Sequence, residues 1–172
     1  TRVDAADKVT GRARYTDDMG LPGMRHAAYV HSTIAHGMVL SIDASEALAL
    51  PGVEAVFTAD DVPGFLFPTA GHPYSMDPSH GDVADRLLLT KHVRYYGDEV
   101  AVVVARDGLT ARKAAHLVKV KYEPLPVMTS AETALAPGAP VLQPSVNPAG
   151  NLHKLHTLEC NGTLREALGG AA

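Results

Sequence analysis

The sequence lacks the features that mark membrane, secreted or nucleic-acid-binding proteins. Its 172 residues include a single cysteine, Cys160, which cannot form an internal disulfide and is compatible with a reducing compartment. Each uninterrupted apolar run is far shorter than the ~18 residues that a membrane-spanning helix needs. The first twelve residues are polar and lack the apolar core of a secretory signal. The net charge of −4, with scattered basic residues, leaves no basic surface for nucleic acid. These absences favour a cytoplasmic protein.

The signatures of common catalytic sites are also missing. The nearest match to a phosphate-binding loop is Gly97-Asp98, which has no second or third glycine, so a Rossmann or P-loop site is excluded. Cys160 has no neighbouring base and is expected to be inert. The adjacent carboxylates Asp17-Asp18 and Asp60-Asp61 would point to opposite faces of a strand, so neither pair can act as an acid/base couple. We interpret both pairs as turn-forming or helix-capping residues.

Nine histidines raise the question of a metal site. His153 and His156 are three residues apart and could share a helix face. Glu159 and Cys160 are near them but do not complete a ligand set, so we favour a solvated linker. Elsewhere, His31 and His36 fall at expected strand ends and are interpreted as polar edge residues.

Two further histidines, His72 and His80, fall in the run Pro63–Arg86, which has many prolines and glycines and no sustained period. Irregular runs of this length are typical of interface or functional loops, or of disorder. These histidines could therefore meet a partner or a substrate funnel. Because no carboxylate converges with them, we assign them no catalytic role.

The clearest pattern runs from Val93 to Val127. Residues Glu99–Ala105 are apolar on both faces, which predicts a strand in the middle of a covered sheet. An aspartate there, as in Val102→Asp, is expected to unfold the domain. After Asp107-Gly108, a helical stripe is formed by Ala111, Ala114, Ala115 and Val118. Val118–Glu123 then alternates, as a half-buried strand does, and prolines follow it.

The rest of the chain predicts short elements. Strands are expected at Arg12–Thr16, Met24–Ser32, Met38–Asp43 and Val53–Thr58. Short helices are expected at Ser45–Leu50 and Ser130–Leu135, and a capping box at Thr163–Glu166 opens another. Residues 137–150 read as a proline-rich loop.

Three segments resemble the α/β-hammerhead domain of the molybdenum-binding subunits of xanthine dehydrogenases and aldehyde oxidases. They are DAADKVTGRARYTDD, VHSTIAHGMVLSIDASEALALPGVEAVFTADDVPG and GDEVAVVVARDGLTARKAAHLVKVKYEPLPV. The resemblance extends from Asp4 to about Leu152, in order and with natural spacing. The segments TAGHPYSMDP and DVADRLLLTKHVRYYGDEVA resemble the bacterial xanthine dehydrogenase branch most closely.

The resemblance implies an α+β fold of the α/β-hammerhead type, a mixed sheet with short covering helices. It implies a hammerhead domain over residues 1–152, followed by a linker and the start of a molybdopterin-binding region over residues 153–172. In the family, molybdopterin is held by glycine-rich loops and the base is a glutamate, both in later domains. No position of this sequence matches them, so no catalytic, cofactor-binding or metal-binding residue is expected here. The chain is expected to be an excised, inactive piece of an enzyme.

The implied enzyme is a molybdenum hydroxylase acting on purines such as xanthine or hypoxanthine, which passes electrons to iron–sulfur clusters, FAD and NAD. Its implied partners are the rest of the molybdenum-binding subunit and the FAD-binding and 2Fe-2S subunits or domains, without nucleic acid or membrane. Two alternatives stay open. One is an aldehyde or other N-heterocycle oxidase of the same family. The other is a non-catalytic assembly or binding module that uses the 63–86 loop.

Overall fold

The computed structural model describes residues 2–68, 83–144 and 147–152. The chain divides into two compact units, Thr1–Phe65 with Leu87–Leu125, and Leu66–Arg86 with Pro126–Ala172. The first unit holds the main sheets and helices, and each unit is described by itself.

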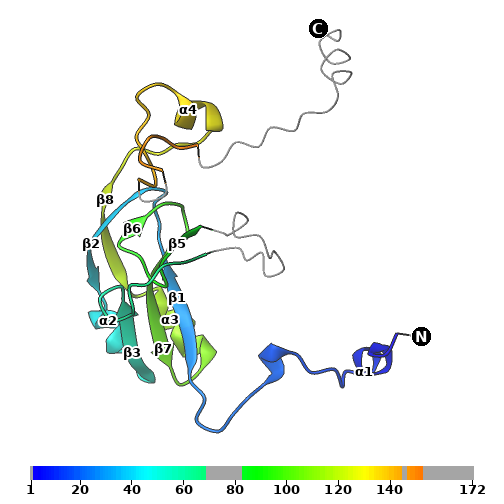
Figure 1. The fold of residues 1–172 in the computed structure, drawn as a ribbon. Helices are drawn as coiled ribbons and strands as arrows, with labels where there is room; N and C mark the ends of the chain where they lie inside the picture. The colour runs from blue at the N-terminus through cyan, green and yellow to red at the C-terminus, as the bar shows by residue number, and fades with distance from the viewer. Residues whose placement is uncertain (1, 69–82, 145–146, 153–172) are drawn as a thin grey trace, which may run out of the picture. The chain divides into compact units, whose positions relative to one another are not determined.

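The first sheet of this unit is built around the strand that the sequence marks as central. It contains β1 (His26–His31), β7 (Glu99–Ala105) and β3 (Val53–Thr58) in the order β1-β7-β3, with antiparallel pairing throughout (Figure 1). On its inner face, Ala101, Val103 and Ala105 are fully buried. The prediction of a central strand over 99–105 is confirmed.

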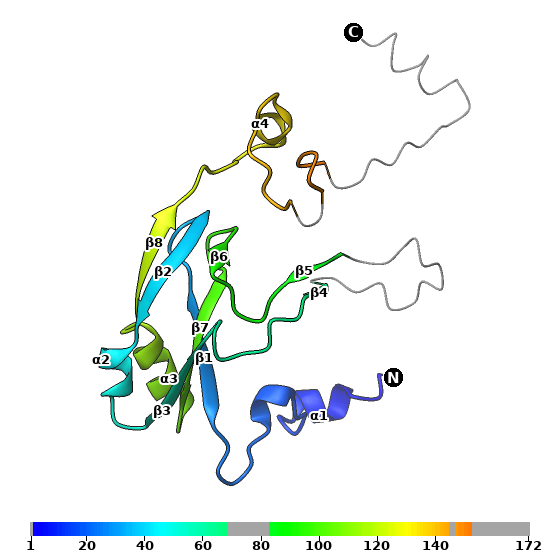
Figure 2. The same ribbon diagram turned by 60° about the vertical axis from the view of Figure 1, so that its left-hand side comes forward.

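Helix α3 (Gly108–Ala115) covers this inner face together with α2 (Ser45–Leu48), and Figure 2 shows both helices on the same side of the sheet. The expected small-residue stripe is confirmed, because Ala111 and Ala114 are fully buried. Small side chains let the helix lie close to the strands. The helix begins where the Asp107 carboxylate accepts a hydrogen bond from the Thr110 amide at 2.8 Å.

The second sheet contains β6 (His92–Val93), β2 (Gly37–Asp43) and β8 (Lys119–Pro124) in the order β6-β2-β8. Glycine is needed at the start of β2, because a Cβ on Gly37 would lie 2.5 Å from the Glu123 carbonyl oxygen. The alternation expected for 118–123 is confirmed, with Val120 and Tyr122 more buried than their neighbours.

The α+β class and the short covering helices are confirmed. The strand arrangement differs from the expected single mixed sheet. Strands of the described residues form two three-stranded sheets and one two-stranded ladder, and every pairing among them is antiparallel. Strand direction depends on the path of the chain between strands, which residue periodicity does not encode.

The second face of β7 is covered less than the sequence predicted. Val100, at the start of the strand, is fully buried, but Val102 and Val104 are only partly buried. The cross-strand neighbours of Val102, Tyr29 and Phe57, are 45% and 39% exposed. The expectation that the strand is covered on both faces is therefore only half correct within the described residues. Val103, not Val102, is the fully buried residue in the middle of the strand.

The expected strand at Arg12–Thr16 is wrong. A short helix, α1 (Ala5–Val9), precedes this segment and a 3-10 turn, η1 (Thr16–Asp18), ends it. The amides of Arg12 and Ala13 donate to the Asp7 carbonyl oxygen at 2.8 and 2.9 Å, so local bonds replace strand pairing.

The second unit holds a short ladder, β4 (Phe67–Pro68) with β5 (Ala84–Arg86), inside the run that the sequence marked as irregular. It also holds α4 (Ala131–Leu135), which confirms the short helix expected at 130–135, and the Ser130 side chain caps its first turn. The side chain of Asn151 joins the loop to this helix by donating to the carbonyl oxygens of Ala134 and Pro140, both at 2.9 Å. In the part of the chain that the structure describes, the helices are all too short or too polar to cross a bilayer.

Candidate functional site

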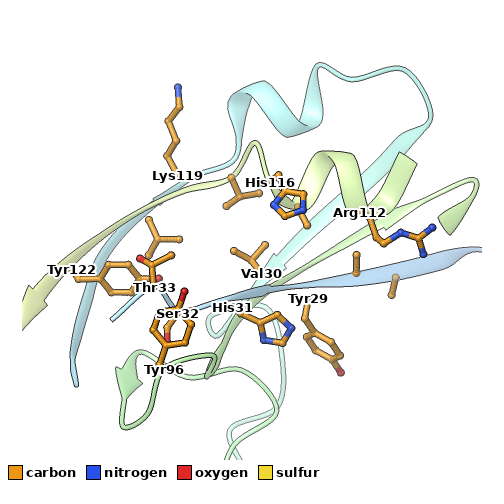
Figure 3. A pocket seen from close by; sticks show the side chains of 15 residues that line it. Tyr29, Val30, His31, Ser32, Thr33, Tyr96, Arg112, His116, Lys119 and Tyr122 are labelled. Atoms are coloured by element: carbon orange, nitrogen blue, oxygen red, sulfur yellow. The ribbon is translucent and has the colours of Figure 1, made fainter. Parts of the chain in front are cut away.

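One hollow of the first unit is a groove between the edge strands β1 and β8, with the C-terminal end of α3 on one wall (Figure 3). Its volume is about 890 Å³. Polar and aromatic side chains that line it include Tyr29, His31, Tyr96, Arg112, His116 and Lys119. Edge strands carry unpaired backbone groups, so the groove suits a packed or extended polypeptide better than a small buried ligand.

The groove contains few of the groups that catalysis requires. None of its described lining residues is a carboxylate or a cysteine. His31 Nδ1 donates to the Gly97 carbonyl oxygen at 2.8 Å, which fixes the proton on Nδ1. The Lys119 ammonium pairs with Glu46, which raises the lysine pKa. Burial raises the pKa of Tyr122. His31 and Lys119 are thus held by Gly97 and Glu46, which are not among the residues that line the groove.

Beside the groove, Ser32 joins two loops and explains why Gly97-Asp98 is not a phosphate cradle. The single proton of its buried hydroxyl is shared between the carbonyl oxygens of Ile34 and Tyr95, which lie 3.1 and 3.0 Å from Oγ. The same oxygen accepts from the amides of Gly97 and Asp98, both at 3.2 Å. The amides that a phosphate would need are therefore already bonded within the protein.

Asp98 is part of this loop and is 8% exposed. Its carboxylate accepts from the Arg94 amide at 3.0 Å and from its neighbour Glu99 at 3.2 Å. Gly97 adopts a φ of 95°, a left-handed conformation that favours glycine. The prediction that Gly97-Asp98 is a turn without a phosphate site agrees with this geometry.

His36 is not the polar edge residue that the sequence suggested. It is 9% exposed, and its Nε2 lies 3.0 Å from Nε2 of His92 on β6. The ring centroids are 5.2 Å apart, so the rings meet head to head, as in an N–H···N hydrogen bond. One ring must donate and the other accept, so the contact tolerates one proton between the two facing nitrogens but not two.

The pKa of His92 is lowered, chiefly because burial disfavours the charged ring. The positive charge of Arg94 and the facing His36 lower it further, while Asp98 acts in the opposite direction. Sequence reasoning missed this pair because its members are 56 residues apart and meet only through the pairing of β2 with β6.

The adjacent carboxylates form turns, as predicted. Asp18 accepts from the Tyr15 amide at 2.9 Å. Asp61 accepts from the amide and hydroxyl of Thr58 at 2.7 and 2.9 Å, and these bonds lower the Asp61 pKa. Asp60 points elsewhere and pairs with Lys91 at 2.5 Å. The two carboxylates of the Asp60-Asp61 pair therefore have different structural roles.

Several sequence candidates fall outside the described residues, namely His72, His80, His153, His156 and Cys160. Within residues 2–68, 83–144 and 147–152, no group of three or more His, Cys, Asp or Glu side chains could hold a metal ion. The absence of catalytic, cofactor-binding and metal-binding residues stays a prediction for the chain as a whole.

Comparison with known proteins identifies the family. Residues 10–126 match the family described as aldehyde oxidase and xanthine dehydrogenase, a/b hammerhead domain. The chain is 52% identical over 170 residues to the xanthine dehydrogenase molybdenum-binding subunit of Escherichia coli O157:H7, covering 99% of this chain and 22% of that protein. It is 42% identical over 145 residues to the carbon monoxide dehydrogenase large chain of Afipia carboxidovorans, covering 84% and 17%.

A solved structure shows the same fold. Quinoline 2-oxidoreductase from Pseudomonas putida 86 superposes with a TM-score of 0.72 at 35% identity, covering 89% of this chain and 19% of that chain. The chain thus spans about a fifth of the length of the relatives it matches. It belongs to the aldehyde oxidase and xanthine dehydrogenase family, as its a/b hammerhead domain.

Proposed function

We propose that this chain is the structural hammerhead domain of a xanthine dehydrogenase-type molybdenum-binding subunit. The observation that carries the proposal is the 52% identity to such a subunit over 99% of the chain. The identity to the carbon monoxide dehydrogenase large chain is lower, at 42%. The complete enzyme would hydroxylate purines such as xanthine or hypoxanthine and pass electrons to 2Fe-2S clusters and FAD in partner subunits or domains.

Our proposal assigns no contact with molybdopterin to the described residues. The amides of Gly97 and Asp98, at the sequence's nearest match to a phosphate loop, both donate to Ser32. The groove beside them lies between two edge strands, which suits a packed polypeptide segment. We therefore assign no step of the reaction to this chain. Its role is to pack against the cofactor-binding part of the subunit and help hold it in place.

The domain limits and the location belong to the same proposal. We place the hammerhead domain at residues 1–152 and the linker into the molybdopterin-binding region at 153–172. We place the protein in the cytoplasm, since a chain with one cysteine in 172 residues needs no oxidising compartment.

A substrate panel tests the proposal. The complete polypeptide that contains this chain, purified with its partner subunits, should reduce NAD⁺ with xanthine or hypoxanthine in preference to an aldehyde, quinoline or carbon monoxide. Preference for one of the latter substrates would keep the family but contradict the purine assignment. Xanthine turnover by residues 1–172 alone would contradict the structural role.

A further inference from the structure

The β1-β7-β3 sheet has an apolar outer face that the described residues leave partly open. In two cross-strand rows, each of the three strands contributes one residue, and we call these six residues the outer face: Ala27–Val104–Ala55 and Tyr29–Val102–Phe57. Both rows are free of charged side chains. The first row, which we call the alanine row, has alanine on both edge strands, and these short side chains leave more room for a packed layer than the aromatic rings of the second row.

A charged pair lies at the margin of the outer face. Arg25, two residues before Ala27, pairs with Glu54 of β3 at 2.5 Å. Both side chains are nearly half exposed. An apolar centre with a polar margin is the usual composition of a surface that another protein layer covers.

The two faces of β7 carry similar apolar residues, but they are not equally buried. The inner face is sealed by α3, with Val103 fully buried, whereas Val102 on the outer face remains partly exposed. Valine and alanine on both faces of a central strand are typical of sheets covered on both sides. The composition of the strand therefore predicts a second layer over its outer face, and the described residues supply only part of that layer.

We propose that the outer face is covered by an apolar layer from the remaining part of the same molybdenum-binding subunit. This rests on the proposed function. The 52% identical relative has most of its length outside the part that this chain matches, since the match covers 22% of that protein. The covering layer should present apolar side chains that fill the alanine row and pack against Tyr29 and Phe57.

The size of the outer face favours this occupant over a second copy of the chain. A stable interface between separate proteins needs about 20–30 residues on each side. Six side chains are far fewer, but a layer from the same polypeptide is held nearby by the chain itself and needs no such area. The groove between β1 and β8 shares Ala27 and Tyr29 with the outer face, but it is a weaker candidate for an apolar layer, because Arg112, His116 and Lys119 also line it.

Cysteine labelling tests the proposal. Tyr29→Cys and Phe57→Cys are made separately, in the complete polypeptide and in residues 1–172, and their modification by a thiol reagent is followed by peptide mass spectrometry. Leu48→Cys on α2, at a residue that is 52% exposed, gives the reference rate in each protein. Relative to this reference, both outer-face cysteines should react at least about tenfold more slowly in the complete polypeptide, because their side chains become buried.

The possible results separate the proposals. Equal relative rates in the two proteins would overturn the outer-face assignment. Protection in residues 1–172 that grows with protein concentration would assign the face to a second copy and overturn it as well. If the complete polypeptide carries molybdenum and oxidises xanthine while the cysteines stay reactive, only the outer-face inference fails. If they are protected but no molybdenum is bound, only the proposed function fails. Unchanged melting temperatures of the cysteine variants of residues 1–172 verify that the fold is kept.

Discussion

Replacing Val103 and Val102 separately by alanine compares the two faces of one strand with the same chemical change. Val103 is fully buried against the helix side of the sheet, and Val102 is partly exposed on the outer face. Val103→Ala removes about 1.6 kcal/mol of transfer free energy at ~0.8 kcal/mol for each methylene-sized group. The cavity adds to this, for a total loss of about 2–3 kcal/mol in the free energy of unfolding.

Val102→Ala should cost about 1 kcal/mol or less, because part of the side chain is already in water and solvent can fill the space. Both losses are measurable against a total stability of ~5–15 kcal/mol. Urea denaturation of residues 1–172, followed by circular dichroism, measures them if the dependence on urea stays the same in both variants. A loss at Val102 equal to or larger than the loss at Val103 would refute the assignment of inner and outer faces. The unfolding expected for Val102→Asp is accordingly now predicted for Val103→Asp.

Three further predictions concern hydrogen-bonded side chains. Because the pKa of His92 is lowered in the folded chain, the unfolded chain binds more protons just below pH 6.5. The free energy of unfolding should therefore rise with pH through that window. In melting curves recorded at a series of pH values, His92→Gln should flatten this rise. Hydrogen bonds from Thr110 lower the pKa of Asp107 to about 2, so the contribution of Asp107 to stability is present above pH 3.8 and is lost as the pH falls toward 2. Asp107→Ala should lower the melting temperature at pH 7 and abolish this acid-dependent loss of stability. Ser32→Ala removes the hydroxyl that bonds two loops and should lower the free energy of unfolding, measured by urea denaturation, by about 1–3 kcal/mol. The control Ser45→Ala, at an exposed residue, should lower it by less. Equal losses in the two variants would contradict the role of Ser32.

The strand–helix–strand unit from Glu99 to Pro124 was predictable because its signals are local. Alternation, the Asp107-Gly108 break and a stripe of alanines each depend on residues a few positions apart. The Arg12–Thr16 strand was predicted wrongly for a related reason. Its alternation is only a few residues long, and bonds to Asp7 and Asp18 satisfy the backbone without a partner strand.

Features that depend on distant residues were not predictable in the same way. The contact between His36 and His92 exists only because β2 pairs with β6, and nothing near either histidine indicates it. Likewise, β4 and β5 flank the 69–82 segment, and their pairing joins residues on both sides of it. The incomplete cover of Val102 could not be read from its neighbours either, because an apolar pattern records that a face is buried but not by which polypeptide.

The most direct test of the structural-domain assignment is the molybdenum content of residues 1–172 and of the complete polypeptide, measured side by side by elemental analysis. The assignment predicts stoichiometric molybdenum and xanthine-dependent reduction of NAD⁺ in the complete enzyme, and neither in residues 1–172. Stoichiometric molybdenum in residues 1–172 would contradict it, because this chain would then hold the cofactor that we assign to the rest of the subunit.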